Sequence, residues 1–250
     1  MQVHKNRLRL KKLLQFCTVM QKIIVTIDGY SSCGKSTLAK ALAKQLNYIF
    51  VDSGAMYRAI TLYFLRQHIN WHADNHKEVV EALNEINLEF AYNDRTNSSD
   101  MLLNDENVEQ LIRDMLVSEN VSEVAAIKEV REFAVAQQQK MGEKRGIVMD
   151  GRDIGTTVFP DAELKIFVTA DPGVRVERRF KELYEKNPLI TIEEIQNNLQ
   201  MRDYIDSHRE FSPLRKAEDA VELDNTNLTR DEQLKLALKW AKERQKMTVS

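Results

Sequence analysis

The fold of this chain is decided by the stretch KIIVTIDGYSSCGKST, residues 22–37. Its apolar first half is typical of a buried strand, and it leads into G-x-x-x-x-G-K-[ST], the pattern of a phosphate-binding loop. The two glycines let the backbone coil so that successive N–H groups point into one concavity, to which the following helix adds the positive end of its dipole. Lys35 can then reach the β- and γ-phosphates of a nucleotide, and the Ser36 hydroxyl can bind a magnesium ion that bridges them.

The residues after this loop argue against a chance match, which would be an ordinary glycine-containing turn. They place Leu38, Ala41, Leu42 and Leu46 at helical spacing. A buried strand, a glycine loop and a helix therefore follow one another in the order that a nucleotide-binding loop requires.

Composition limits the classes of protein to which the chain can belong. Its 250 residues are enough for one substantial core, and a single α/β domain with insertions is the simplest arrangement. Residues 1–20 hold five of the 36 basic residues and no acidic one, so the rest of the chain is acidic and unsuited to general nucleic-acid binding. No stretch approaches the ~18 apolar residues of a membrane span, so we expect neither a nucleic-acid nor a membrane partner.

Residues 1–20 are predicted to be a disordered basic leader or an over-extended start, ahead of a single domain over residues 21–250. A role in organelle targeting or surface binding is the alternative. The apolar part, residues 13–20, is short and lacks a small-x-small cleavage site, which argues against an export signal. Cys17 and Cys33 are the only cysteines, and we expect both to be free thiols in a reducing cytoplasm.

Short apolar runs alternate with helical stretches along the chain. Five of these runs are typical of buried parallel strands: residues 22–28, 48–51, 146–149, 164–169 and 220–223. Helix starts, marked by an Asp-Pro pair or by the spacing of a capping box, occur at Asp171-Pro172, Thr191-Glu194 and Thr229-Glu232. This alternation predicts a doubly wound three-layer α/β fold whose ligand lies beyond the carboxyl ends of the strands.

Two segments fall outside this alternation. Between about residues 88 and 112, short alternating runs flank the turn-forming residues 93–99, which predicts a small antiparallel subdomain. Residues 175–215 are rich in arginine and in charge, and we interpret them as a mobile helical lid.

Polar side chains follow the strand predicted at residues 48–51. The sequence DSGAMYR, residues 52–58, turns through a glycine into a helix. Arg58 could there hold a second phosphate opposite Lys35. The alternative is that Asp-Ser-Gly is an ordinary helix cap without a ligand.

The strand predicted at residues 146–149 is also followed by polar residues. Asp150 occupies the position of the acid that, in many phosphate-loop enzymes, positions magnesium through water. Arg152 and Asp153 come next, and a buried structural ion pair is one interpretation of them. Two glycines within five residues favour instead a loop that closely approaches a ligand.

Four motifs in series make the chain resemble the bacterial cytidylate (CMP) kinases, a family of P-loop nucleoside monophosphate kinases. The motifs occupy residues 29–37, 52–58, 150–162 and 202–214, and the similarity extends over about residues 21–245. The resemblance implies a three-layer P-loop NTPase-type core with a five-stranded parallel sheet, a monophosphate-binding insert and a helical lid. The implied segments are a core at 21–60, 125–174 and 216–250, an insert at about 61–124 and a lid at about 175–215.

The resemblance also implies a role for each matching residue. ATP would bind to Gly29, Tyr30, Ser31, Ser32, Cys33, Gly34, Lys35, Ser36 and Thr37, with magnesium at Ser36 and, through water, at Asp150. CMP would bind to Ser31, Ser53, Tyr57, Arg58, Ser122, Arg131, Arg152, Asp153, Arg202, Asp206 and Arg209. In that set, Ser122, Arg131 and Asp153 would read the cytosine edge and Asp206 would face the ribose. Catalysis would depend on Lys35, Arg152, Arg202 and Arg209.

The sequence departs from the family pattern at a few positions. Tyr30 replaces a proline that is common after the first glycine, and Ser32-Cys33 replaces smaller residues without changing the glycine spacing. Ile205 stands in the lid motif where some members have another arginine. Arg175, Arg178 or Arg179 could supply the missing phosphate contact, or they could form a solvated helix face.

The activity that the resemblance implies is transfer of the ATP γ-phosphoryl group to the 5′-phosphate of CMP or dCMP, in pyrimidine nucleotide metabolism. Magnesium would accompany ATP, and the protein would be a cytoplasmic monomer. A different acceptor, such as UMP, AMP or another small hydroxyl compound, is one alternative. A nucleotide-dependent switch is another, although the guanine-reading sequence Asn-Lys-x-Asp is absent.

Overall fold

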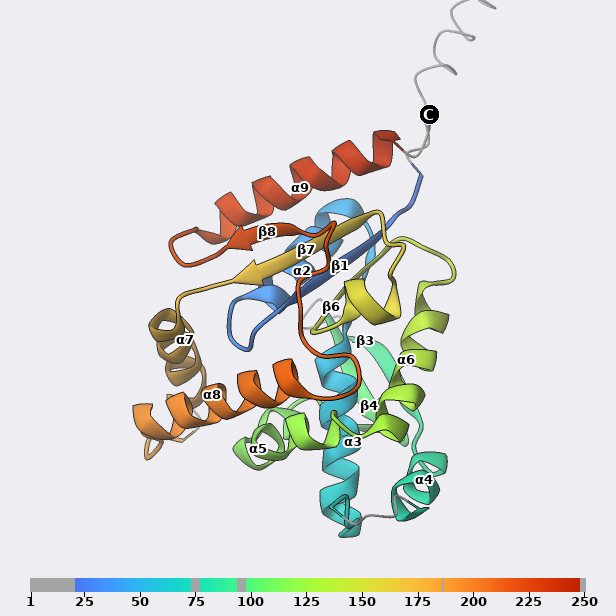
Figure 1. Cartoon of the computed structure of the whole chain (residues 1–250), viewed down its shortest axis with the longest axis vertical. Coiled ribbons are helices and arrows are strands. Elements are labelled where there is room, and N and C mark those ends of the chain that lie inside the picture. The colour runs from blue at the N-terminus through green and yellow to red at the C-terminus, as the bar shows by residue number, and fades with distance from the viewer. Residues whose placement is uncertain (1–20, 73–76, 94–97, 186, 248–250) are drawn as a thin grey trace, which may run out of the picture.

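The computed structural model describes residues 21–72, 77–93, 98–185 and 187–247. Its centre is a five-stranded parallel sheet of strand order β2-β6-β1-β7-β8 (Figure 1). The strands are β1 (Ile24–Gly29), β2 (Ile49–Asp52), β6 (Ile147–Gly151), β7 (Leu164–Thr169) and β8 (Val221–Asp224). All five predicted strands are confirmed, with boundaries that shift by at most two residues.

Helices cover both faces of this sheet and make the three predicted layers. On one face, α2 (Lys35–Leu46) and α9 (Arg230–Met247) pack on the apolar side chains of β1, β6, β7 and β8. On the other face lie α3 (Ser53–Gln67), α6 (Lys128–Gly142) and the π-helical turn η2 (Ile154–Val158). Because apolar residues of β1 and β6 are buried on both faces, these two strands read as continuous apolar runs in the sequence.

The segment between α3 and α6 contains the predicted antiparallel subdomain. Helix α4 (Lys77–Asn84) precedes a three-stranded sheet of β3 (Leu88–Asn93), β4 (Ser98–Leu103) and β5 (Glu106–Asn107), after which come η1 (Leu111–Arg113) and α5 (Met115–Val124). Residues 94–97 of the predicted turn lie outside the described residues. The subdomain shares a hydrophobic core with α3, in which Phe64 of α3 packs with Met101 and Ile112.

Two helices, α7 (Pro172–Tyr184) and α8 (Ile192–His208), form most of the predicted lid. Asp171 caps α7 with Pro172 in its first turn, and Thr191 and Glu194 form a reciprocal capping box at α8, as predicted. A small core of their own holds the two helices together, made of Leu183, Ile190, Ile195 and Leu199.

The parallel strands all end at one edge of the sheet, and β1 leaves that edge through a turn that requires glycine. Gly29 has φ +145°, and a Cβ at this position would lie 2.1 Å from the carbonyl oxygen of Val168 on the neighbouring strand. The backbone can therefore begin its phosphate loop close against β7. Within the described residues, no helix is both long enough and apolar enough to cross a bilayer.

The shared core of α3 and the antiparallel subdomain predicts a large cost for truncating Phe64, whose side chain is fully buried. Replacing it by Ala should lower the free energy of unfolding by about 3–5 kcal/mol, from lost burial and the cavity left behind. Urea unfolding measures this change. Leu189→Ala is the control, because that leucine is 89% exposed and should change stability by less than about 0.5 kcal/mol.

Candidate active site

A cavity of about 780 Å³ opens at the carboxyl edge of the sheet, where the sequence places the ligand. It is lined by all of the residues predicted to bind CMP and by both predicted magnesium ligands. Of the predicted ATP-binding residues, it is lined by Ser31, Ser32, Gly34, Lys35, Ser36 and Thr37. The side chains of Tyr30 and Cys33 are directed elsewhere: Tyr30 packs edge-on against Phe167, and Cys33 is a free thiol in the hydrophobic core.

The conformation of the phosphate loop is fixed by its own backbone and by Asn225, the residue that follows β8. Ser32 and Gly34 have positive φ values of 58° and 93°, and a Cβ on Gly34 would lie 2.5 Å from the side-chain nitrogen of Asn225. That nitrogen donates to the Cys33 carbonyl over 2.8 Å. Lys35 donates to the Tyr30 carbonyl, and burial together with the charge of Arg152 lowers the pKa of its ammonium group. The loop thus presents a buried cation whose charge an anion would stabilise.

Ser36 and Asp150 meet beside this loop, as the sequence predicts for a magnesium site. The Ser36 hydroxyl donates to Asp150 Oδ2 over 2.6 Å, while the buried Asp150 Oδ1 has no partner. Burial and the negative charge of Asp52, its register neighbour on β2, raise the pKa of Asp150 to about 6. An unpaired carboxylate oxygen next to a hydroxyl fits the oxygen preference of Mg²⁺. The described residues hold no group of three acidic, His or Cys side chains for a metal, so most ligands would come from the nucleotide and water.

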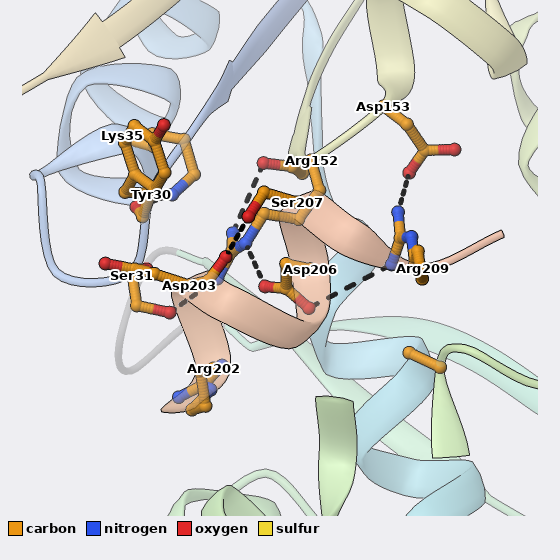
Figure 2. Close-up of polar contacts among 12 residues, drawn as sticks. Tyr30, Ser31, Lys35, Arg152, Asp153, Arg202, Asp203, Asp206, Ser207 and Arg209 are labelled. Atoms are coloured by element: carbon orange, nitrogen blue, oxygen red, sulfur yellow. Dashed lines mark hydrogen bonds and ion pairs between the residues drawn. The ribbon is translucent and has the colours of Figure 1, made fainter. Parts of the chain in front are cut away.

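Arg152 joins the phosphate loop to the lid. Its Nη2 donates to Ser31 Oγ over 2.7 Å and its Nε to Asp206 Oδ2 over 2.8 Å (Figure 2). Burial would lower the pKa of this guanidinium, but the charge of Asp206 raises it. The loop after β6 and helix α8 therefore meet the phosphate loop at one guanidinium group.

Two further arginines bring excess positive charge to the same cavity. Arg202 of α8 donates to Ser118 Oγ over 3.1 Å and keeps a buried Nε without a partner. Burial and the charge of Arg152 lower its pKa to about 9. Burial, with the charge of Arg113, lowers the pKa of Arg58 to about 10. Each guanidinium would be stabilised by a phosphate, whose oxygens accept several N–H bonds.

The far end of the cavity is a polar wall around Asp153. One carboxylate oxygen accepts from Arg131 of α6, and the other accepts from Arg209 over 3.1 Å (Figure 2 shows the bond from Arg209). Arg131 also lies over the ring of Tyr57, 5.5 Å from its centroid. Burial raises the pKa of Tyr57 to about 12, so its hydroxyl stays protonated. Ser122, buried on α5, completes this wall. Arg152 and Asp153 therefore do not form the ion pair considered from the sequence: Asp153 pairs with Arg131 and Arg209, and Arg152 pairs with Asp206. All five side chains line the cavity.

The three arginines of α7 differ in what they contact. Arg175 stacks on Tyr30, 5.3 Å from the ring centroid, pairs with Asp203 over 2.6 Å and donates to the Ser31 carbonyl over 3.3 Å. Arg178 donates to the Asn225 carbonyl over 2.8 Å, whereas Arg179 pairs with Glu182. Arg178 and Arg179 line the cavity, whereas Arg175 does not.

Comparison with known proteins agrees with this geometry. The sequence model described as Cytidylate kinase matches residues 25–243. The chain belongs to the cytidylate kinase family. It is 56% identical over 215 residues to the cytidylate kinase of Cytophaga hutchinsonii, covering 86% of this chain and 91% of that protein. It is 54% identical to that of Flavobacterium psychrophilum, with 88% and 97% covered, and 56% identical to that of Bacteroides thetaiotaomicron, with 86% and 94% covered. The resemblance and the fold class predicted from the sequence are confirmed.

Several residues of this cytidylate kinase family site were not selected from the sequence. Asp52 is the last residue of β2 and Asp28 the last but one of β1, so the rule that selected Asp150 near a strand end could have found them. Asp28 accepts the backbone N–H groups of Ile154 and Gly155 and so fixes the turn after β6. No sequence signal indicates Arg113, Ser118 or Asn225, because only tertiary packing brings these side chains to the cavity.

The burial of Asp28 predicts a pH-dependent stability. Burial raises its pKa from 3.8 to about 7, so between these values the unfolded chain is ionised while the folded chain stays protonated. Stability from this group is therefore full below pH 4 and is lost as pH rises towards 7. Asp28→Asn removes this dependence on pH. The free energy of unfolding of the variant, minus that of the natural chain, should therefore rise by about 2 kcal/mol between pH 5 and pH 8.

Urea unfolding of both chains at the two pH values measures that difference. The surface substitution Asp161→Asn is the control and should show no such change. An equal stability difference at pH 5 and pH 8 would mean that Asp28 titrates alike in the folded and unfolded chain.

Proposed function

We propose that this member of the cytidylate kinase family transfers the γ-phosphoryl group of ATP to CMP or dCMP, forming CDP or dCDP. The observation that carries this proposal is one cavity that joins a complete phosphate loop to a cluster of arginines and, beyond them, to the wall around Asp153. Such a cavity has room and charge for two phosphorylated ligands side by side. Family membership supports a nucleoside monophosphate kinase.

The phosphate loop provides the donor end. Its backbone N–H groups and the start of α2 would bind the β- and γ-phosphates of ATP, with Lys35 between them. Ser36 and Asp150 would hold Mg²⁺, which when bound with ATP neutralises phosphate charge. Arg178 and the Asn225 carbonyl lie over the outer side of the loop, where the donor nucleotide would be covered.

The arginines provide the acceptor end. Arg58 and Arg152 would bind the CMP phosphate, whose oxygen is already anionic near neutral pH, so no general base is needed. Arg152 is well placed for both partners because it already reaches Ser31 of the phosphate loop and Asp206 of the lid. Catalysis then comes from alignment of the two phosphates and from neutralising the transferred group with Lys35, Arg152, Arg202 and Arg209.

The wall around Asp153 would select the base. Cytosine carries an amino donor at C4, where uracil carries an acceptor. The carboxylate of Asp153 and the Ser122 hydroxyl offer acceptors for that amino group, and a buried acceptor left unpaired disfavours uracil. Asp206, on the same side as Arg209, would bind the ribose.

We propose that the chain is divided into a core, a monophosphate-binding insert and a lid. Residues 21–60, 125–174 and 216–250 would form the core, residues 61–124 the monophosphate-binding insert, and residues 175–215 a lid that excludes water from the reaction. Residues 73–76, 94–97, 186 and 248–250 of these segments lie outside the described residues. We also propose that the protein acts as a monomer in the cytoplasm.

Lys35→Met should remove most of the turnover while leaving the fold intact, because the ammonium group that faces the transferred phosphoryl is lost. We expect kcat to fall at least ~100-fold, with thermal unfolding little changed. A coupled assay of CDP formation measures this. Lys44→Met, on the exposed face of the same helix, is the matched control and should keep full activity. Full activity of the Lys35 variant would contradict the proposed role.

The acceptor specificity is tested with CMP, dCMP, UMP and AMP in the same assay. CMP and dCMP should be preferred, and Asp153→Asn should lower kcat/KM for CMP by about 100-fold and narrow the preference over UMP. Thermal unfolding of the variant checks that the ion pairs with Arg131 and Arg209 are not needed for folding. Turnover of UMP as fast as CMP would overturn the assignment, and a titration without a CMP site would favour the nucleotide switch.

A further inference from the structure

A row of four alternating charges lies on the insert side of the cavity, and of its members only Arg58 has a proposed role so far. It runs from Glu109 through Arg113 and Asp52 to Arg58. Arg113, the last residue of η1, donates to Glu109 over 2.7 Å and to Asp52 over 2.9 Å. Arg58 of α3 donates to the same carboxylate over 3.1 Å. Arg113, Arg58 and Asp52 all line the cavity.

Both arginines use the same oxygen of Asp52. Arg113 Nη2 and Arg58 Nη2 each donate to Oδ2, while Oδ1 accepts the backbone N–H of Ala55 over 3.0 Å and so caps α3. Asp52 is therefore fixed in place with both oxygens occupied. Arg58 Nε is buried without a partner, so Arg58 holds Asp52 by one N–H group alone.

We propose that Arg113 is a positioning residue for the monophosphate acceptor, because it shares the charge of Asp52 and so leaves the remaining donors of Arg58 free for the acceptor's phosphate. The inference rests on the proposed function, in which Arg58 binds that phosphate. Without Arg113, the Oδ2 atom of Asp52 would be available to Arg58 alone. Arg58 could then form a bidentate pair with Asp52, which is stronger than a single bond and competes with the phosphate.

Glu109 keeps Arg113 in this role. It accepts from Nε and Nη2 of Arg113 over 3.2 and 2.7 Å, and it lies four residues earlier in the chain. The charges of the row balance as two acids and two arginines. Burial would lower the pKa of Arg113, but the charges of Asp52 and Glu109 raise it, so the guanidinium stays protonated at neutral pH.

The competing explanation is that Arg113 is only a structural tether, since it connects the insert to Asp52 at the end of β2. A tether would affect stability and both substrates alike. A positioning role would act on the acceptor alone and would depend on the charge of Asp52. The two roles are therefore separated by kinetics and by a second substitution at position 52.

The test compares Arg113→Gln, Arg113→Lys and the double variant Arg113→Gln/Asp52→Asn with the natural chain. KM for CMP is measured at saturating ATP and Mg²⁺, KM for ATP at saturating CMP, and thermal unfolding for each. We expect R113Q to raise KM for CMP about 10-fold, with KM for ATP changed less than about 2-fold. R113K, which keeps the charge, should recover most of the affinity.

The double variant should bring KM for CMP back towards the value of the natural chain. The uncharged amide introduced by D52N no longer captures Arg58, yet its oxygen can still cap α3. The matched control is Arg66→Gln, which breaks an exposed arginine–glutamate pair between the end of α3 and Glu106 of β5. It should leave both KM values unchanged.

An unchanged KM for CMP in R113Q, a parallel rise of both KM values, or no recovery in the double variant would each overturn the inference. If R113Q does not fold, Glu109→Gln decides, because it weakens the contacts that hold Arg113 on Asp52. A rise in KM confined to CMP supports the inference, and no rise or an equal rise in both KM values overturns it. Failure of the natural chain to make CDP would instead refute the proposed function, so the two outcomes are distinct.

Discussion

The structure depends on a balance of buried charges at one edge of a parallel sheet. Lys35, Arg202 and Arg209 are buried and Arg152 is largely so, and each would be costly to bury without a counter-charge. Asp206 and Asp153 supply part of that charge. In the proposed function, the phosphates of the two nucleotides supply the remainder. The cavity therefore keeps buried donors without a partner, Arg58 Nε and Arg202 Nε, which an anion would satisfy.

Two features of the fold bring these charged side chains together: the common edge at which the parallel strands end, and one face of α8. Parallel strands end at one edge, so Asp52 and Asp150 become register neighbours, and the loops that follow them converge with the phosphate loop. The lid adds Arg202, Asp206 and Arg209 from a single helix and its end, because residues spaced by three or four positions share one helix face. Local sequence thus fixes each element, and topology brings the elements together.

Much of this could be predicted from the sequence. The phosphate loop, the five strands, Asp150 and the helix caps each have a local signal, such as an apolar run, a glycine spacing or a capping pair. Ser122 and Arg131 had none, and only the family resemblance pointed to them. Arg113 and Ser118 were missed entirely, because their importance lies in partners more than 60 residues away along the chain. The sequence offered the three arginines of α7 as alternatives but could not tell their contacts apart, since only the structure shows that Arg175 stacks on Tyr30.

The two sides of the cavity differ in how firmly they are anchored. The antiparallel subdomain packs into the same hydrophobic core as α3, whereas α7 and α8 have a separate small core of their own and meet the neighbouring α5 at residues such as Met115. In the proposed function, movement on binding should therefore be one-sided, with α7 and α8 moving while the proposed acceptor pocket stays in place. Compounds that bind only in the proposed acceptor pocket would not prevent this movement. Compounds that bind under α8 and block the movement would inhibit turnover without competing with the cytosine base of CMP.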